Sequence, residues 1–131
     1  HRDDFRRLVK TLDYAIGNEH EWCSLYQSDL STALEQATAD AGLVACTRSG
    51  HDVIIVRGEE QAVVPVRRVV PVDATGAGDQ FAAGFLYGIA TGQSLATAGR
   101  MGCVAAAEVI SHFGARPEAD LKALFRKEEL I

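Results

Sequence analysis

The chain has 131 residues, enough for one domain at most, and 47% of them are hydrophobic, which is ample for a packed core. Its net charge is −5 and its largest basic clusters are two arginine pairs, so neither nucleic-acid binding through a basic patch nor binding to a membrane is expected. No run of about 18 apolar residues could form a transmembrane helix, and the charged first residues do not resemble a signal peptide.

Three cysteines, Cys23, Cys46 and Cys103, lie far apart and form no Cys-x-x-Cys pair. They are expected to be reduced thiols in a cytoplasmic protein. The chain does not begin with methionine, so we expect residues 1–131 to be a piece of a longer protein.

Helical periodicity predicts helices over residues 2–11, 19–26, 78–90 and 95–111. A further helix is expected between capping residues at 28–31 and a glycine stop at 41–42, and the last one is expected from Pro117 onward. Extended segments are expected at residues 12–16, ended by Gly17-Asn18, and at 43–47, 53–56, 61–66 and 69–72. Because strands alternate with helices, the pattern predicts an α/β layer with a mostly parallel sheet, to which a hairpin-like connection at 58–60 could add antiparallel strands.

The segment Asp73-Ala74-Thr75-Gly76-Ala77-Gly78-Asp79 is the most informative stretch, because it joins an extended pattern to a helical one. Two glycines at such a junction let backbone N–H groups turn toward one point at a helix N-terminus, where an anion is favoured. Asp79 would repel that anion, so its presence suggests a base beside a phosphate site. The alternative is an ordinary turn with a helix-start acid. The segment is neither a Walker A loop nor a dinucleotide fingerprint.

Asp-x-Thr-Gly-Ala-Gly-Asp followed by a Phe-x-x-Gly-Phe helix resembles the C-terminal signature of the ribokinase/PfkB carbohydrate and nucleoside kinases. The resemblance spans nearly the whole chain. It includes Asn18-Glu19-His20-Glu21, which is similar to the family's Asn-x-x-Glu motif, the strand at 43–47, and the segment 105–117, which resembles adenosine-kinase-like members. The fold expected from it is a ribokinase-like three-layer αβα sandwich, of which residues 1–131 form the C-terminal nucleotide-binding portion without the substrate half and lid.

The resemblance also implies roles for individual residues. Asp79 is the expected general base, and the backbone of Gly76, Ala77 and Gly78 is the expected anion hole. The nucleotide is expected to contact Thr47, Ser49, Gly50, Thr75, Val109 and His112. Mg²⁺ is expected near Asn18, Glu21 and Asp73. The implied cofactors are ATP and Mg²⁺, and a monovalent cation, K⁺, is left open, as is a homodimer.

Several assignments have a structural alternative. Asn18 and Glu21 have the spacing of a capping box, and this role can coexist with metal binding. Asp73 could orient the loop, reach the water shell of the metal or only cap its own turn. Ser49 stands where the family usually has glycine, and its Cβ limits conformations with positive φ.

The sequence therefore predicts that the intact protein transfers the γ-phosphoryl group of ATP to a primary hydroxyl of a sugar or nucleoside, with adenosine weakly favoured. The piece alone is expected to be inactive. The alternatives are a nucleotide-binding module without turnover and a purely structural domain.

Overall fold

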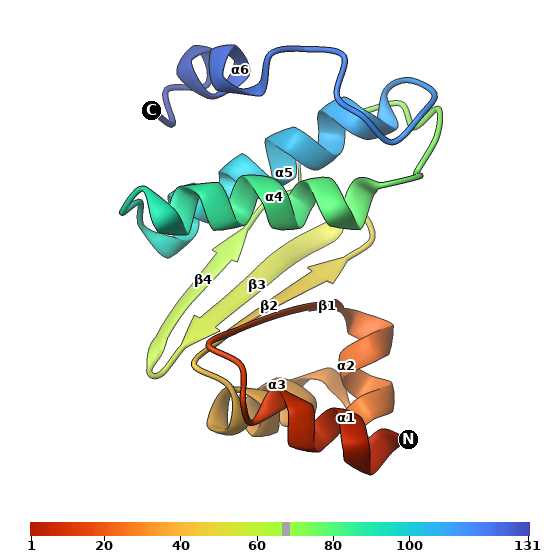
Figure 1. The fold of residues 1–131 in the computed structure, drawn as a ribbon, viewed down its shortest axis with the longest axis vertical. Helices are drawn as coiled ribbons and strands as arrows, with labels where there is room; N and C mark the ends of the chain where they lie inside the picture. Colours follow the sequence, from red (N-terminus) through yellow and green to blue (C-terminus); the bar gives the residue numbers. More distant parts are fainter. Residues whose placement is uncertain (67–68) are drawn as a thin grey trace. The chain divides into compact units, whose positions relative to one another are not determined.

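The computed structural model describes residues 1–66 and 69–131, and the chain divides into two compact units, His1–Val63 and Val64–Ile131 (Figure 1). The arginine pair at 67–68, one of the two basic clusters noted in the sequence, lies outside the described residues.

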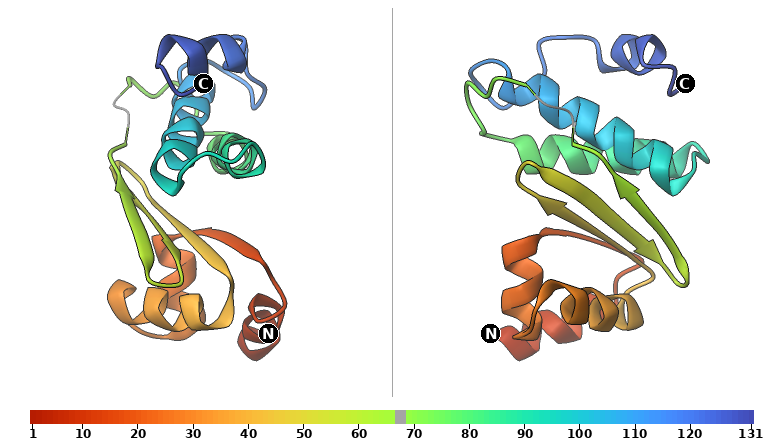
Figure 2. Two further views of the ribbon diagram at one scale, coloured as in Figure 1. Left: turned by 90° about the vertical axis from the view of Figure 1, so that its left-hand side faces the viewer. Right: turned by 180° about the vertical axis from the view of Figure 1, so that it is seen from behind.

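The first unit combines three helices with a four-stranded sheet. Its elements are α1 (Arg2–Val9), β1 (Tyr14–Asn18), α2 (Glu19–Tyr26), α3 (Leu30–Asp40), β2 (Leu43–Arg48), β3 (His51–Arg57) and β4 (Glu60–Val64), whose last residue belongs to the second unit. The three helices lie on one face of the sheet (Figures 1 and 2). β2 is apolar along most of its length, from Leu43 to Cys46, because it is buried between two neighbouring strands.

The sheet has the order β1-β2-β3-β4 and is mixed rather than mostly parallel. β1 pairs with β2 in parallel, whereas β2 pairs with β3 antiparallel. The expectation of a mostly parallel sheet is thus wrong for these strands. The reason lies in the connection at Ser49 and Gly50, because a two-residue turn can only join antiparallel strands and a parallel pair needs a long crossover.

The first strand starts and ends later than expected, at Tyr14–Asn18, so Gly17 and Asn18 belong to the strand instead of breaking it. Gly42 likewise does not stop the preceding helix through a left-handed cap. The helix ends at Ala41 in an extended conformation, and a Cβ on Gly42 would lie 2.9 Å from the carbonyl oxygen of Asp13. Close approach of two backbone segments therefore explains this glycine.

The second unit contains α4 (Ala77–Ala90), α5 (Leu95–Ile110) and α6 (Leu121–Lys127). α4 and α5 pack through glycines, since a Cβ on Gly84 would lie 2.6 Å from the Met101 carbonyl oxygen and one on Gly88 would lie 2.7 Å from Ala98. On the facing helix, Gly102 lies against Phe81 in the same way. The two helices are thus close enough for backbone to touch backbone.

Two boundaries in this unit differ from the sequence prediction. Residues 69–72 form no strand, although the amide of Val72 donates to the carbonyl of Ile110 at 2.7 Å. The last helix begins at Leu121, because the side chain of Asp120 accepts from the amide of Ala123 and caps it there, so Pro117 lies in the preceding loop. Of the helices in the described part of the chain, none has the length and apolar character needed to cross a membrane.

Candidate functional site

The glycine-rich segment is held at its start by the side chain of Asp73. One carboxylate oxygen, Oδ1, accepts from the amide and the hydroxyl of Thr75 at 2.9 and 2.6 Å, and the other accepts from the amide of Gly114 at 3.1 Å. The hydrogen bonds from the Thr75 hydroxyl and amide, followed by that from Gly114, lower the pKa of Asp73. The Thr75 contacts fit an Asp73 that caps its own turn, and the Gly114 contact fits one that orients the loop, so these contacts support both structural roles considered for this residue.

Gly76 forms the sharp bend that precedes α4. Its φ of +80° is left-handed, and a Cβ at this position would lie 2.7 Å from the Cβ of Ala115. Any other residue would be strained by its backbone and would collide with the facing loop. As the N-cap residue, glycine also provides no side chain to satisfy the first amides of the helix.

The bend leaves several backbone donors free. The amide of Ala77 donates to the carbonyl of Ala74 at 3.2 Å. The amides of Gly76, Gly78 and Asp79 have no hydrogen-bond partner among residues 1–66 and 69–131. Three donors therefore remain at the positive end of α4, where an anion would complete them.

Asp79 lies in the first turn of α4 and is exposed. Within the described part of the chain its carboxylate makes no hydrogen bond or ion pair. A carboxylate without a partner among the described residues, in the same helical turn as the unpartnered amides, has the chemistry of a base that can accept a proton from a hydroxyl beside a bound phosphoryl group.

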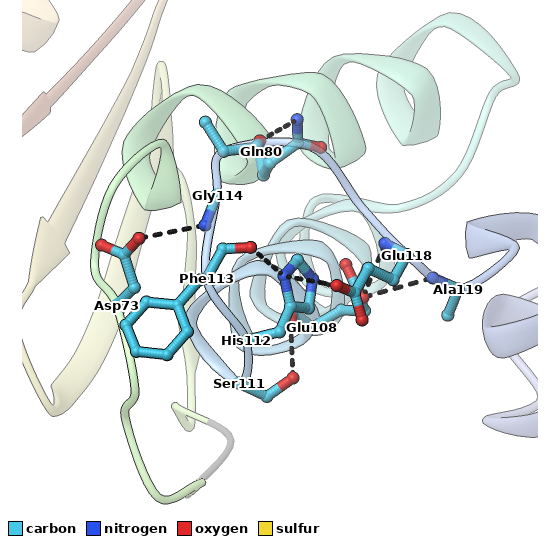
Figure 3. Close-up of polar contacts among 10 residues, drawn as sticks. Asp73, Gln80, Glu108, Ser111, His112, Phe113, Gly114, Glu118 and Ala119 are labelled. Atoms are coloured by element: carbon cyan, nitrogen blue, oxygen red, sulfur yellow. Dashed lines mark hydrogen bonds and ion pairs between the residues drawn. The ribbon is translucent and has the colours of Figure 1, made fainter.

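His112, an expected nucleotide contact, is engaged with its own loop (Figure 3). Its Nε2 lies 2.8 Å from Oε1 of Glu108, and its Nδ1 lies 2.9 Å from the carbonyl oxygen of Phe113. Val109, another expected contact, has no exposed surface. Its side chain belongs to the packed interior and is not accessible to a nucleotide.

The expected metal and nucleotide-loop residues of the first unit lie together at one end of its sheet. Asn18 and Thr47 are partners in the parallel register of β1 and β2, at the carboxyl ends of both strands. Ligands of open α/β sheets bind at such strand ends. The capping box is present, with the Glu21 amide donating to Oδ1 of Asn18 at 2.8 Å and the Asn18 amide donating to Oε1 of Glu21 at 2.9 Å.

The turn after β2 adopts the conformation that the Ser49 side chain disfavours. Ser49 has φ of +40° and Gly50 has φ of +86°, and both are exposed. Two positive φ values suit the tight hairpin between Arg48 and His51, whose residues are paired. The Ser49 side chain is thus tolerated in a left-handed position at some cost in strain.

A groove of about 570 Å³ lies in the first unit, between α1, β1 and α2. It is lined mainly by apolar side chains, and three of them, Phe5, Leu8 and Tyr14, are 60%, 52% and 47% exposed. Glu21 is among the few charged residues of its lining. None of the lining residues comes from the second unit.

Each unit thus gathers its own set of expected site residues. Asn18, Glu21, Thr47, Ser49 and Gly50 lie at one end of the sheet in the first unit, and Asp73, Thr75, Gly76, Ala77, Gly78, Asp79 and His112 lie around the start of α4 in the second. Sequence reasoning missed Glu108 and Gly114, which hold the loop that carries His112. The i, i+4 spacing of Glu108 and His112 on one helix face was the available signal for the first of these.

Comparison with known proteins gives a consistent result. A family model described as "pfkB family carbohydrate kinase" matches residues 1–121. Among solved structures, a probable sugar kinase from Rhizobium etli CFN 42 is similar with a TM-score of 0.92 and 39% identity over 99% of this chain and 41% of its own. The adenosine kinase from Sinorhizobium meliloti has a TM-score of 0.90 and 36% identity over 98% of this chain and 40% of its own.

Among curated proteins, an uncharacterized sugar kinase from Archaeoglobus fulgidus is 33% identical over 114 residues, which is 86% of this chain and 46% of that protein. The chain therefore spans less than half the length of these relatives. The structural similarity confirms the expected ribokinase-like α/β fold.

Proposed function

Because the chain belongs to the pfkB family of carbohydrate kinases, we propose that the whole protein transfers the γ-phosphoryl group of ATP to a hydroxyl group of a sugar or nucleoside. In this proposal the turn at 73–79 binds the phosphoryl group and Asp79 accepts the proton of the attacking hydroxyl. This is the reaction that its sugar-kinase and adenosine-kinase relatives are named for.

The observation that carries the proposal is the set of amides beside a carboxylate at the start of α4, none of which has a partner in the described part of the chain. During transfer, negative charge spreads over the equatorial oxygens of the phosphoryl group, and donors that are already fixed in place stabilise that charge without reorganising. In other enzymes, the loss of one such donor lowers kcat by about 10²–10³-fold. We assign these donors to Gly76, Gly78 and Asp79, since the Ala77 amide already has an acceptor.

Asn18 and Glu21 fit a magnesium ion bound through water. Only one oxygen of the Glu21 carboxylate is used in the capping box, and the other has no partner within the described residues. Mg²⁺ keeps most of its waters and needs few carboxylates, so this second oxygen is sufficient. When bound, Mg²⁺ would neutralise charge on the phosphate oxygens of ATP. The use of K⁺ stays a prediction from the sequence.

The acceptor class is proposed from the relatives, which are named both as sugar kinases and as an adenosine kinase. A panel of ribose, fructose, adenosine, cytidine and inosine with the full-length protein would separate the two classes by kcat/KM. Residues 1–131 alone should bind phosphate-bearing ligands without turnover, because they cover less than half of the relatives.

Replacement of Asp79 by asparagine in the full-length protein tests the proposal. Loss of a general base should lower kcat by about 10²–10⁴-fold, with a smaller effect on the KM for ATP. Asp3→Asn is a matched control, since Asp3 is also an exposed acid in the first turn of a helix and should leave kcat unchanged. Turnover of Asp79→Asn near that of the wild type would contradict the proposed role of this carboxylate.

A further inference from the structure

Glu108 lies at the centre of a small polar network at the C-terminal end of α5 (Figure 3). Its Oε1 faces Nε2 of His112 at 2.8 Å and accepts from the amides of Glu118 and Ala119 at 3.0 and 3.2 Å. The Glu108 and His112 side chains are only 9% and 13% exposed. The other oxygen of Glu108 is buried without a partner in the described part of the chain.

The contacts of His112 fit a doubly protonated imidazole. Nδ1 faces the carbonyl oxygen of Phe113, which can only accept, and Nε2 faces Oε1 of Glu108, which also accepts from two backbone amides, as an ionised carboxylate does. Both ring nitrogens therefore donate, which makes Glu108 and His112 a nearly buried ion pair. A carboxylate with one unpartnered oxygen is costly to bury unless a cation lies beside it, so the pair depends on both charges.

The loop that follows α5 connects this pair to the glycine turn. At its far end Glu108 holds the amides of Glu118 and Ala119, and in its middle the amide of Gly114 donates to Asp73. Ala115 lies directly against Gly76, because a Cβ built on Gly76 would be 2.7 Å from the Cβ of Ala115. The loop at residues 111–119 thus forms the surface against which the bend at Gly76 is set.

We propose that Glu108 and His112, here called the clasp, are positioning residues that hold loop 111–119 against the glycine turn and so fix the direction of its free amides. The effect on phosphoryl transfer rests on the function proposed above, whereas the effect on the turn does not. Neither residue touches the phosphoryl group in this proposal. Catalysis depends steeply on such placement, because a shift of about 1 Å in a reacting group can cost about 100-fold in rate.

The charges around His112 favour its protonated form and so the ion pair of the clasp. Among the residues that the structure describes, the titratable groups that interact with it are Glu108, Glu118 and Asp73, and all three are acids. The hydrogen bond to Phe113, followed by the hydrogen bond and charge of Glu108, raises the pKa of His112. A histidine with a raised pKa stabilises the fold below its unfolded value of about 6.5, and this stabilisation is lost as pH rises through the folded value.

The test uses the full-length protein labelled with ¹⁵N at glycine and histidine. In the wild type, NMR titration should show both ring nitrogens of His112 protonated at pH 7. Glu108→Gln should lower the pKa of His112 and shift the amide signals of Gly76, Gly78 and Gly114. His112→Gln is the second variant, since its amide can still donate to Glu108 without a charge, and it should shift the same glycine signals.

Glu118→Gln is the matched control, because Glu118 is 72% exposed and lies 3.6 Å from the ring, so the three glycine signals should stay in place. A neutral His112 at pH 7, or unchanged glycine signals in both clasp variants, would overturn the inference whether or not the protein is a kinase.

Kinetics give the second readout. Both clasp variants should lower kcat about tenfold with little change in the KM for the acceptor, and the fall in wild-type kcat as pH rises through the folded His112 pKa should disappear in Glu108→Gln. An unchanged kcat and pH profile, with Asp79→Asn inactive, would reject the clasp as a positioning device and leave the proposed function intact. Shifted glycine signals in a protein without turnover would reject the function and leave the clasp intact.

Discussion

The starts of α2 and α4 are both polar segments that resemble family motifs, but the first backbone amides of the two helices are capped differently. At α2, the side chains of Asn18 and Glu21 satisfy each other's backbone amides in a capping box. At α4, Gly76 brings no side chain, and three amides have no partner among the described residues. α3, α5 and α6 are also capped by a side chain, from Asp29, Ser94 and Asp120 respectively. α1 also begins without a side-chain cap, at His1, so a missing cap alone does not distinguish α4. The difference lies in the left-handed Gly76, which sets the amides at the start of α4 next to the Asp79 carboxylate.

The largest effect on this comparison should come from Gly76→Ala. Alanine at a φ of +80° and 2.7 Å from the Cβ of Ala115 should destabilise the fold by about 2 kcal/mol or more. Gly78→Ala is the matched control, since a Cβ at this position would meet no described atom within 4 Å apart from its chain neighbours and the backbone of its own helix, and helix propensity favours alanine by about 0.5–1 kcal/mol. Chemical denaturation of both variants measures the difference, and equal stabilities would show that the bend is not constrained as described.

A smaller loss of stability is expected at the start of α2, where the capping box satisfies the backbone amides. Asn18→Ala removes one half of the capping box and should lower the free energy of unfolding by about 1 kcal/mol. Ser94→Ala removes the cap of α5 and should cost a similar amount.

Asn18→Ala and Ser94→Ala together also distinguish a capping role of Asn18 from a role in metal binding. If Asn18 supports Mg²⁺ as proposed, only Asn18→Ala should raise the Mg²⁺ concentration needed for half-maximal activity of the full-length protein. The same Mg²⁺ dependence in both variants would confine Asn18 to its capping role.

The smallest effect concerns inorganic phosphate at the open helix start. Asp79→Asn removes a negative charge beside the free amides, so it should bind phosphate several-fold more tightly than the wild type although its turnover is lost. The increase in Tm with added phosphate should be correspondingly larger. Asp3→Asn should show the wild-type increase, and a smaller increase for Asp79→Asn would place the phosphate elsewhere.

Much of the fold follows from local signals. Residues 19–26 are helical as predicted, because Asn18 and Glu21 carry their own start signal in four residues. The hairpin after residue 57 follows from its glycine. Residues 69–72 were misjudged because apolar, β-branched residues favour a strand only where a neighbouring strand is present to pair with.

Some features of the candidate site can likewise be predicted from the local sequence, whereas others depend on tertiary contacts. The turn at 73–79 is recognisable because glycine spacing and a helical pattern are both local. The Asp73–Gly114 contact joins residues 41 positions apart, and the glycine at 76 is required partly by Ala115 in a distant loop. Such requirements come from tertiary packing and leave no periodic signal in a single sequence.

The glycine contacts between α4 and α5 have a consequence for motion. Because Gly84 and Gly88 bring the α4 backbone directly onto α5, with no flexible side chains between them, neither helix can slide or tilt without overlapping the other's main chain. We therefore expect any rearrangement within this unit around a ligand to occur in residues 73–76 and 111–120, while α4 and α5 keep their mutual packing.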